Sequence, residues 1–375
     1  MTAPANLLMG DDVSTPLVTL ARRLWPLSRP VSSTTEAQWL LDQYKSSVLS
    51  DATIFYLSVR VEETGDGWIV KGAANHPHVR GVPAQLLRAA GSAPVRDEVI
   101  LLPSQNLGQK RFGVTAIAMA LTWDKPAEGD GVQTQLLMGD PVMLLDESSD
   151  GFYLLLQGHD GYIGWVRSDG IWRLDAEEYA AYLNTPRYVV LRDIKVDDTS
   201  LPAGASLRPA TPADLGENLA LMLPGPEQRQ VVVPRSVVRQ PGAQSAGETI
   251  TSAALSRLTV PYVFGGRSGV GLDCSGLTNV ACSAAGLAIP RDARQQVLVG
   301  QLTATPWFTS ALQPGDLMFF IDETGRVIHT AVSMGGSRFV HASPPEVQVN
   351  SLDPTDPLYS EGWSRAFALA RRLVY

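Results

Sequence analysis

The stretch Leu272-Asp273-Cys274-Ser275-Gly276-Leu277 decides how the rest of this chain is interpreted. It places a cysteine directly after an acidic residue and before a Ser-Gly turn that opens an apolar, helix-compatible run. A thiol in the first turn of a helix faces unpaired backbone N–H groups and the positive end of the helix dipole, and both favour the nucleophilic thiolate. The motif therefore predicts a catalytic thiol at Cys274.

Two histidines downstream supply the partners that such a thiol needs. His329 and His341 lie 12 residues apart in strand-like contexts, on either side of the turn-forming Gly335-Gly336-Ser337. An imidazole can take the thiol proton and later return it to a leaving amine. We expect His329 to be this base and His341 to orient it, an arrangement typical of thiol hydrolases.

Length and charge narrow the class of protein. At 375 residues the chain exceeds one hydrophobic core, so two to four domains are expected. A net charge of −8 disfavours nucleic acid as a partner. No apolar run approaches the roughly 20 residues of a membrane helix. The start of the chain lacks a basic segment followed by an apolar one, and Asp11 and Asp12 interrupt it, which predicts a cytoplasmic protein unless the natural N-terminus was trimmed.

The second cysteine gives no reason to expect a disulfide. Cys282 follows Cys274 by eight residues, about 12 Å along a helix, which is too far for a bond within that helix. We interpret Cys282 as core filler. No cofactor is expected, and we reject a zinc site at His76-Pro77-His78 because no Cys or carboxylate partner lies nearby in sequence.

The pattern of predicted helices and strands changes along the chain and divides it into four segments. Residues 1–113 mix helical and strand-like text, with a possible contribution to the barrel that follows. Residues 114–174 hold short apolar strands between Gly-Asp turns, which suggest a small barrel, and 175–240 read as a second one. Residues 241–375 place helices before antiparallel strands, so the predicted fold class is α+β.

Six landmarks in the C-terminal part occur in the order found in the NlpC/P60 family of papain-like cysteine peptidases, which this part resembles. They are Tyr262 with Gly265-Gly266, Asp273-Cys274-Ser275-Gly276-Leu277, Ile289-Pro290-Arg291-Asp292 with Gln296, Leu312–Phe320, His329-Thr330-Ala331-Val332 and Val340-His341-Ala342-Ser343. The strand Gly161-Tyr162-Ile163-Gly164-Trp165-Val166 resembles the one that closes bacterial SH3-like barrels. The whole chain looks like the branch of γ-D-glutamyl-L-diamino acid endopeptidases that act on murein peptides.

The resemblance implies roles for particular residues. Cys274, His329 and His341 correspond to the family's catalytic residues, and the Tyr262 hydroxyl to the group that faces the developing oxyanion. Four further residues correspond to substrate contacts: Asp273 to the carboxylate that pairs with the free amine of an N-terminal L-Ala, Ser275 to a contact of the D-Glu portion, Tyr162 to a barrel tyrosine that walls the site, and Glu128 to an acidic barrel residue that meets the amine.

Several alternatives stay open. Asp273 could serve only as a helix cap, and Tyr162 only as a barrel-core aromatic. Asp292 stands where several family members carry a serine, so any contact of that hydroxyl is absent. The protein could bind murein through its barrels without turnover, or use the thioester for acyl transfer or another amide. The sequence does not identify the diamino acid, Lys or diaminopimelate, or the oligomeric state.

Overall fold

The structure, a computed structural model, describes residues 15–26, 29–49, 51–129, 131–240 and 246–373. The chain divides into two compact units, Met1–Asn106 and Leu107–Tyr375. The first unit therefore ends seven residues before the expected boundary at 113. The expected boundary at 241 and the N-terminal segment behind the compartment prediction lie outside the described residues. Among the described helices, none has the length and apolarity to cross a membrane.

The first unit packs helices on one three-stranded sheet. Its strands run in the order β1-β2-β3, with β1 antiparallel and β3 parallel to β2. Leucines of α2 and α4 meet Trp68 and Val70 of the sheet in a core of buried apolar side chains. The elements are α1 (Thr15–Leu24), α2 (Thr34–Ser47), β1 (Leu57–Thr64), β2 (Gly67–Ala74), α3 (Pro77–Arg80), α4 (Val82–Ala89) and β3 (Val95–Leu101).

The second unit opens with a seven-stranded antiparallel barrel of the expected kind. The strand order is β10-β4-β7-β8-β9-β5-β6, around a core that includes Leu136, Leu144 and Leu154. The strands are β4 (Phe112–Thr115), β5 (Met119–Trp123), β6 (Val132–Leu137), β7 (Pro141–Glu147), β8 (Tyr153–Gly158), β9 (Ile163–Arg167) and β10 (Ile171–Leu174). Because β4 pairs with β7 and β10, a boundary at 113 would cut a barrel strand in two.

A helix, α5 (Ala176–Asn184), separates the two β-rich segments. It contacts β4 and β10, and the Tyr182 hydroxyl donates to the Gly139 carbonyl at 3.0 Å, so this helix belongs with the first barrel rather than with the second. The second barrel-like domain has a five-stranded sheet in the order β16-β15-β14-β11-β17 beside the hairpin β12–β13. Its strands are β11 (Tyr188–Val190), β12 (Ile194–Val196), β13 (Thr199–Leu201), β14 (Ser206–Leu215), β15 (Asn218–Met222), β16 (Gln230–Pro234) and β17 (Val238–Arg239).

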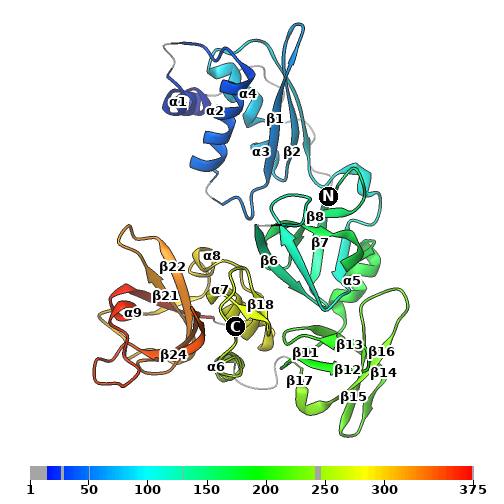
Figure 1. Cartoon of the computed structure of the whole chain (residues 1–375), viewed down its shortest axis with the longest axis vertical. Helices are drawn as coiled ribbons and strands as arrows, with labels where there is room; N and C mark the ends of the chain where they lie inside the picture. The colour runs from blue at the N-terminus through cyan, green and yellow to red at the C-terminus, as the bar shows by residue number, and fades with distance from the viewer. Residues whose placement is uncertain (1–14, 27–28, 50, 130, 241–245, 374–375) are drawn as a thin grey trace. The chain divides into compact units, whose positions relative to one another are not determined.

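The C-terminal domain, coloured yellow to red in Figure 1, combines helices with a six-stranded antiparallel sheet. The strand order is β20-β25-β21-β22-β23-β24. Helix α6 packs on β21 and α7 on β22. The helices are α6 (Ala246–Leu255), α7 (Cys274–Ala284), α8 (Ala293–Gln296) and α9 (Glu361–Ala366). The strands are β18 (Arg267–Ser268), β19 (Gly271–Leu272), β20 (Gln301–Ala304), β21 (Pro314–Ile321), β22 (Val327–Met334), β23 (Arg338–Ser343), β24 (Glu346–Ser351) and β25 (Phe367–Arg372).

Candidate active site

The thiol of Cys274 lies at the first residue of α7. Asp273 caps this helix, and its carboxylate accepts hydrogen bonds from the backbone N–H groups of Gly276 at 2.6 Å and Gly265 at 2.8 Å. A Cβ at Gly276 would lie 2.0 Å from the Gly266 carbonyl oxygen, so only glycine fits the first turn. The helix therefore begins where the motif predicted, with its chain packed against the Gly265-Gly266 turn.

A closed hydrogen-bond network fixes Asp273. Arg291 donates to its two carboxylate oxygens at 3.0 and 2.8 Å, and the Ser275 hydroxyl donates at 3.3 Å. The same guanidinium donates to the Ser275 oxygen at 2.8 Å and to the Thr134 hydroxyl of the first barrel at 2.7 Å. Asp273, Ser275 and Arg291 are all buried. The network thus ties the helix that bears the thiol to strand β6.

This pairing bears on the amine contact expected of Asp273. If the amine were the only partner of this carboxylate, a substrate with a blocked amine would leave it unpaired. In the structure Asp273 already accepts hydrogen bonds from Gly265, Gly276, Ser275 and Arg291. A carboxylate offers about four lone-pair sites, so a substrate amine has to compete with groups of the protein. Blocking the amine would not by itself leave this carboxylate without partners.

The two histidines form a chain that ends on Asn350. His329 Nε2 lies 2.8 Å from His341 Nδ1, and His341 Nε2 lies 2.8 Å from Asn350 Oδ1. The Asn350 amide nitrogen donates to the Leu358 carbonyl, which turns Oδ1 toward the ring. Because Oδ1 only accepts, His341 carries its proton on Nε2 and accepts at Nδ1. His329 then donates from Nε2, which leaves its Nδ1 unprotonated and able to take a proton.

The strands account for this placement. His329 lies on β22 and His341 on β23, which pair as antiparallel neighbours through the turn predicted at Gly335-Gly336-Ser337. Trp363 of α9 stacks on the His329 ring with centroids 4.2 Å apart and an interplanar angle of 22°. His329 is 5% exposed and His341 is fully buried, so both rings are held by packing as well as by hydrogen bonds.

The thiol meets the same strand. The backbone N–H of Thr330, the residue after His329, donates toward the Cys274 sulfur, as does that of Ser275. Burial nevertheless raises the pKa of the thiol to about 11, and the charge of Asp273 adds to the rise. Burial also lowers the pKa of His329 to about 3 and that of His341 to about 4. At neutral pH the resting site therefore holds a thiol and two neutral imidazoles, which differs from the expected resting thiolate.

Tyr262 lies at the edge of this group. Its backbone forms a parallel bridge with Leu272, two residues before the thiol. Burial, followed by the charges of Cys274 and Asp273, raises the pKa of the Tyr262 hydroxyl, which keeps it protonated and able to donate. This is the state that an oxyanion contact requires.

Strand β6 of the first barrel lies against the Gly265-Gly266 turn beside the thiol. The Tyr162 hydroxyl donates to Gln133 Oε1 at 3.0 Å, and a Cβ at Gly265 would lie 3.0 Å from the Gln133 carbonyl oxygen. Tyr162 thus bonds the side chain of the residue whose backbone lies against the Gly265 turn. Glu128 accepts instead from Arg167 at 3.0 Å in an exposed ion pair, and among the described residues no hydrogen bond or ion pair joins it to the other site residues.

Sequence reasoning missed three residues of this region. Asn350 orients His341, Trp363 covers His329, and Arg291 neutralises Asp273. Only Arg291 carried a local signal, as part of the family landmark Pro290-Arg291. Within the described part of the chain, no three His, Cys, Asp or Glu side chains gather as a metal site would require.

Comparisons with known proteins agree with this architecture. Residues 259–372 match the model of the NlpC/P60 family, and residues 123–171 match that of the bacterial dipeptidyl-peptidase Sh3 domain. The γ-D-glutamyl-L-lysine dipeptidyl-peptidase of Bacillus cereus is 26% identical over 263 residues, which are 65% of this chain and 75% of that protein. Dipeptidyl-peptidase 6 of Lysinibacillus sphaericus is 40% identical over 116 residues, 30% of this chain and 40% of that protein.

A solved structure shows the same fold over most of the chain. The crystal structure of an NlpC/P60 family protein from Bacillus cereus covers 70% of this chain and 100% of its own, with a TM-score of 0.59 and 20% identity. Fold and site together define an α+β cysteine hydrolase preceded by an SH3-like barrel, as predicted. Residues 259–372 form an NlpC/P60 domain and residues 123–171 a bacterial SH3 domain, and the chain is similar to the dipeptidyl-peptidases named above.

Proposed function

We propose that this protein hydrolyses the γ-D-glutamyl–diamino acid amide bond of murein peptides that carry a free N-terminal L-Ala, in murein peptide recycling. The observation that supports this most strongly is the hydrogen-bonded chain from Asn350 through the buried His341 to the buried His329, which adjoins the Thr330 N–H that donates to the Cys274 sulfur. It provides a nucleophile, a base of defined tautomer and a group that fixes the base.

The resting protonation states define the first step. Burial disfavours a charge on the thiol alone or on the imidazole alone. Transfer of the proton from Cys274 to His329 Nδ1 instead creates a thiolate and an imidazolium together, and each charge stabilises the other. The thiolate attacks the γ-carbonyl carbon, and the Tyr262 hydroxyl donates to the oxyanion. His329 then protonates the departing amine, and water cleaves the thioester.

The relatives support the choice of bond and of substrate end. The name of the Bacillus cereus relative specifies a γ-D-glutamyl-L-lysine bond and the removal of a dipeptide. Removal of a dipeptide from one end requires a site that is closed beyond that end. Tyr162 and Gln133 of the first barrel lie beside the Gly265 turn and could provide this closure. Asp273 would contribute its charge to the amine only in competition with Arg291.

Product analysis tests this function. Mass spectrometry would follow L-Ala-γ-D-Glu-diaminopimelate, the corresponding lysine peptide and the N-acetylated form of each. We expect release of L-Ala-D-Glu from free peptides at least about tenfold faster than from acetylated ones, because a recognised amine is lost. Cys274→Ala is the control without turnover. Equal cleavage of free and acetylated peptides would refute the end requirement, and no cleavage of any peptide would refute the function.

A substitution at Asn350 tests the relay. Asn350→Leu removes the acceptor that sets the tautomer of His341, and we expect kcat to fall about 10- to 100-fold with little change in KM. Asn350→Gln, which keeps an amide oxygen, should recover part of the activity. Unchanged kcat in Asn350→Leu would show that the relay does not set the state of the base.

A further inference from the structure

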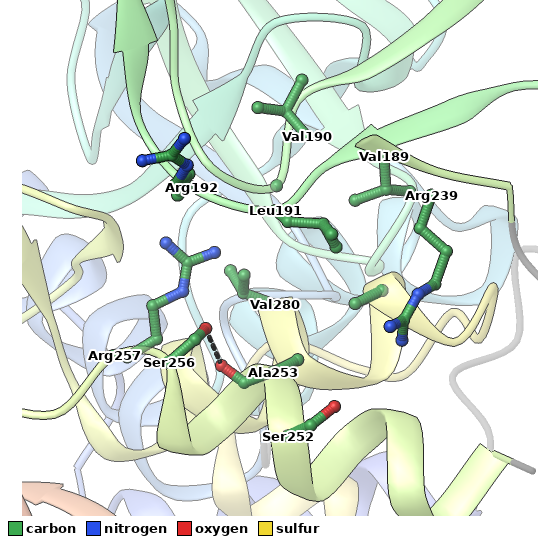
Figure 2. A pocket seen from close by; sticks show the side chains of 12 residues that line it. Val189, Val190, Leu191, Arg192, Arg239, Ser252, Ala253, Ser256, Arg257 and Val280 are labelled. Carbon is green, nitrogen blue, oxygen red and sulfur yellow. Dashed lines mark hydrogen bonds between the residues drawn. The ribbon is translucent and has the colours of Figure 1, made fainter. Parts of the chain in front are cut away.

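A cavity separate from the thiol site lies between the second barrel-like domain and the helices of the peptidase domain. It has a volume of about 240 Å³ and is lined by residues around β11 and by residues of α6 and α7. Three of its lining residues are Arg192, Arg239 and Arg257 (Figure 2). Cys274 does not line it, and Val280, the nearest lining residue of α7, lies six positions along the helix, about 9 Å from the thiol's position on the axis.

Arg257 is the informative member of this cluster. It is only 7% exposed, and its Nε has no hydrogen-bond partner in the part of the chain that the structure describes. Within the same residues its guanidinium forms no ion pair within 4 Å. Figure 2 shows its guanidinium directed toward Arg192 and the Leu191 segment. A buried charge is costly unless it is paired, so this guanidinium is expected to have a partner that the chain itself does not supply.

The surroundings of Arg257 define the charge of that partner. Asp193 is the acidic residue whose field reaches Arg257, and one of its oxygens accepts from the Ala203 N–H at 2.7 Å. Arg192 is exposed and Arg239 half-buried, so only Arg257 is charged and deeply buried. One buried positive charge is balanced by a monoanion, and a guanidinium binds a carboxylate through two parallel hydrogen bonds.

The apolar lining and the volume of the cavity indicate the size and the apolar part of the ligand. Val189, Val280 and Ala253 contribute apolar surface to the cavity. The volume corresponds to roughly eight waters at about 30 Å³ each. A molecule of about that many non-hydrogen atoms, with a carboxylate at one end and a short hydrocarbon body, would satisfy the guanidinium and fill the apolar part.

We propose that this cavity is a binding site for a small organic carboxylate with an apolar body, held by Arg257 with Arg192 and Arg239 at its rim. The site is separate from the thiol site and does not depend on catalysis. Its occupant joins the second barrel-like domain to α6 and α7, so binding stabilises the folded protein.

Calorimetric titration of the full chain with isovalerate tests the site. Isovalerate carries one carboxylate on a branched four-carbon body, and isoamyl alcohol and inorganic phosphate serve as comparison ligands. We expect saturable binding of isovalerate, retained in Cys274→Ala and weakened about tenfold in Arg257→Gln, which loses a charge-assisted contact. The matched control is Arg326→Gln, which removes an 81% exposed arginine and leaves binding unchanged.

Each other outcome overturns the proposal. The proposal is wrong if isovalerate does not bind. It is also wrong if binding is unchanged in Arg257→Gln or if isoamyl alcohol binds equally well, because Arg257 would then not recognise the carboxylate. Binding of phosphate alone would show that the apolar walls do not select the ligand. If Arg257→Gln fails to fold, Arg239→Gln at the rim is expected to weaken binding about threefold by loss of a more distant charge, and no change there would contradict the assignment.

Discussion

The peptidase domain contacts its two barrels in different ways. Toward the first barrel it extends Arg291 and Arg267, both 1% exposed and both paired: Arg291 with Asp273 and Thr134, Arg267 with Asp140 and the Gln135 carbonyl. Beside the second barrel-like domain it places Arg257, which is buried but, unlike Arg267 with its ion pair to Asp140, forms no ion pair within 4 Å among the described residues. The paired arginines join the two domains, whereas the buried charge of Arg257 is costly without a counter-charge, which is the basis of the anion site proposed above.

The paired contact should be the more sensitive to mutation. Arg291→Met leaves the buried Asp273 carboxylate without its counter-charge, and we expect the free energy of unfolding to fall by about 3–5 kcal/mol. Urea unfolding would measure this. Asp273→Asn in the same chain removes the stranded charge while keeping an N-cap side chain, so it should recover much of the loss. A cost below about 1 kcal/mol for Arg291→Met would contradict this interpretation of the contact.

The buried imidazoles of His329 and His341 make the stability of the peptidase domain depend on pH. The folded pKa values of His329 and His341, about 3 and about 4, lie below the ordinary value of 6.5. Between each folded pKa and pH 6.5 the unfolded chain binds more protons than the folded one. The contribution of the two rings to the free energy of unfolding is therefore fully present above pH 6.5 and decreases as the pH falls. The expected loss is about 1.4 kcal/mol per pH unit for each ring.

Thermal unfolding between pH 7 and pH 4 would test this loss. His329→Gln should flatten the dependence by the share of one ring, and His78→Gln, at an exposed position, should leave it unchanged. If His329→Gln has the same slope as the wild type, the buried ring is not neutral in the folded protein.

The unpaired arginine should give the smallest effect. Arg257→Met removes a buried charge and keeps most of the side-chain volume, so we expect the free energy of unfolding to stay within about 1 kcal/mol of the wild type or to rise. Arg267→Met is the matched control, because it strands Asp140 and should cost more. An equal, large loss in both variants would show that Arg257 also serves as a structural pair.

The sequence predicted the parts of this molecule that local patterns encode. The motif around Cys274 predicted the start of α7, and the turn between the histidines predicted the pairing of β22 with β23. The contact between Arg291 and Thr134 joins residues 157 positions apart, and no local periodicity reports such a pair. The seven-residue shift of the first boundary has a similar cause, because a strand at Phe112 is defined by its neighbours in the barrel.

Burial explains why the resting Cys274 is a thiol rather than the thiolate that a helix start favours. A helix start favours the thiolate, but the depth at which Cys274 lies depends on the sheet and loops that cover it, and desolvation outweighs the helix end. Asn350 was missed for a related reason. Its role follows from the register of β24 against β23, which brings it beside His341.

The rate at which iodoacetamide alkylates each cysteine at pH 7 tests the central claim most directly, namely that the sulfur loses its proton to the neighbouring imidazole. We predict that Cys274 reacts far faster than the fully buried Cys282 and that His329→Ala slows it by about tenfold or more, since the variant lacks the imidazole that takes the thiol proton. Equal rates in the wild type and in His329→Ala, or preferential labelling of Cys282, would contradict the account.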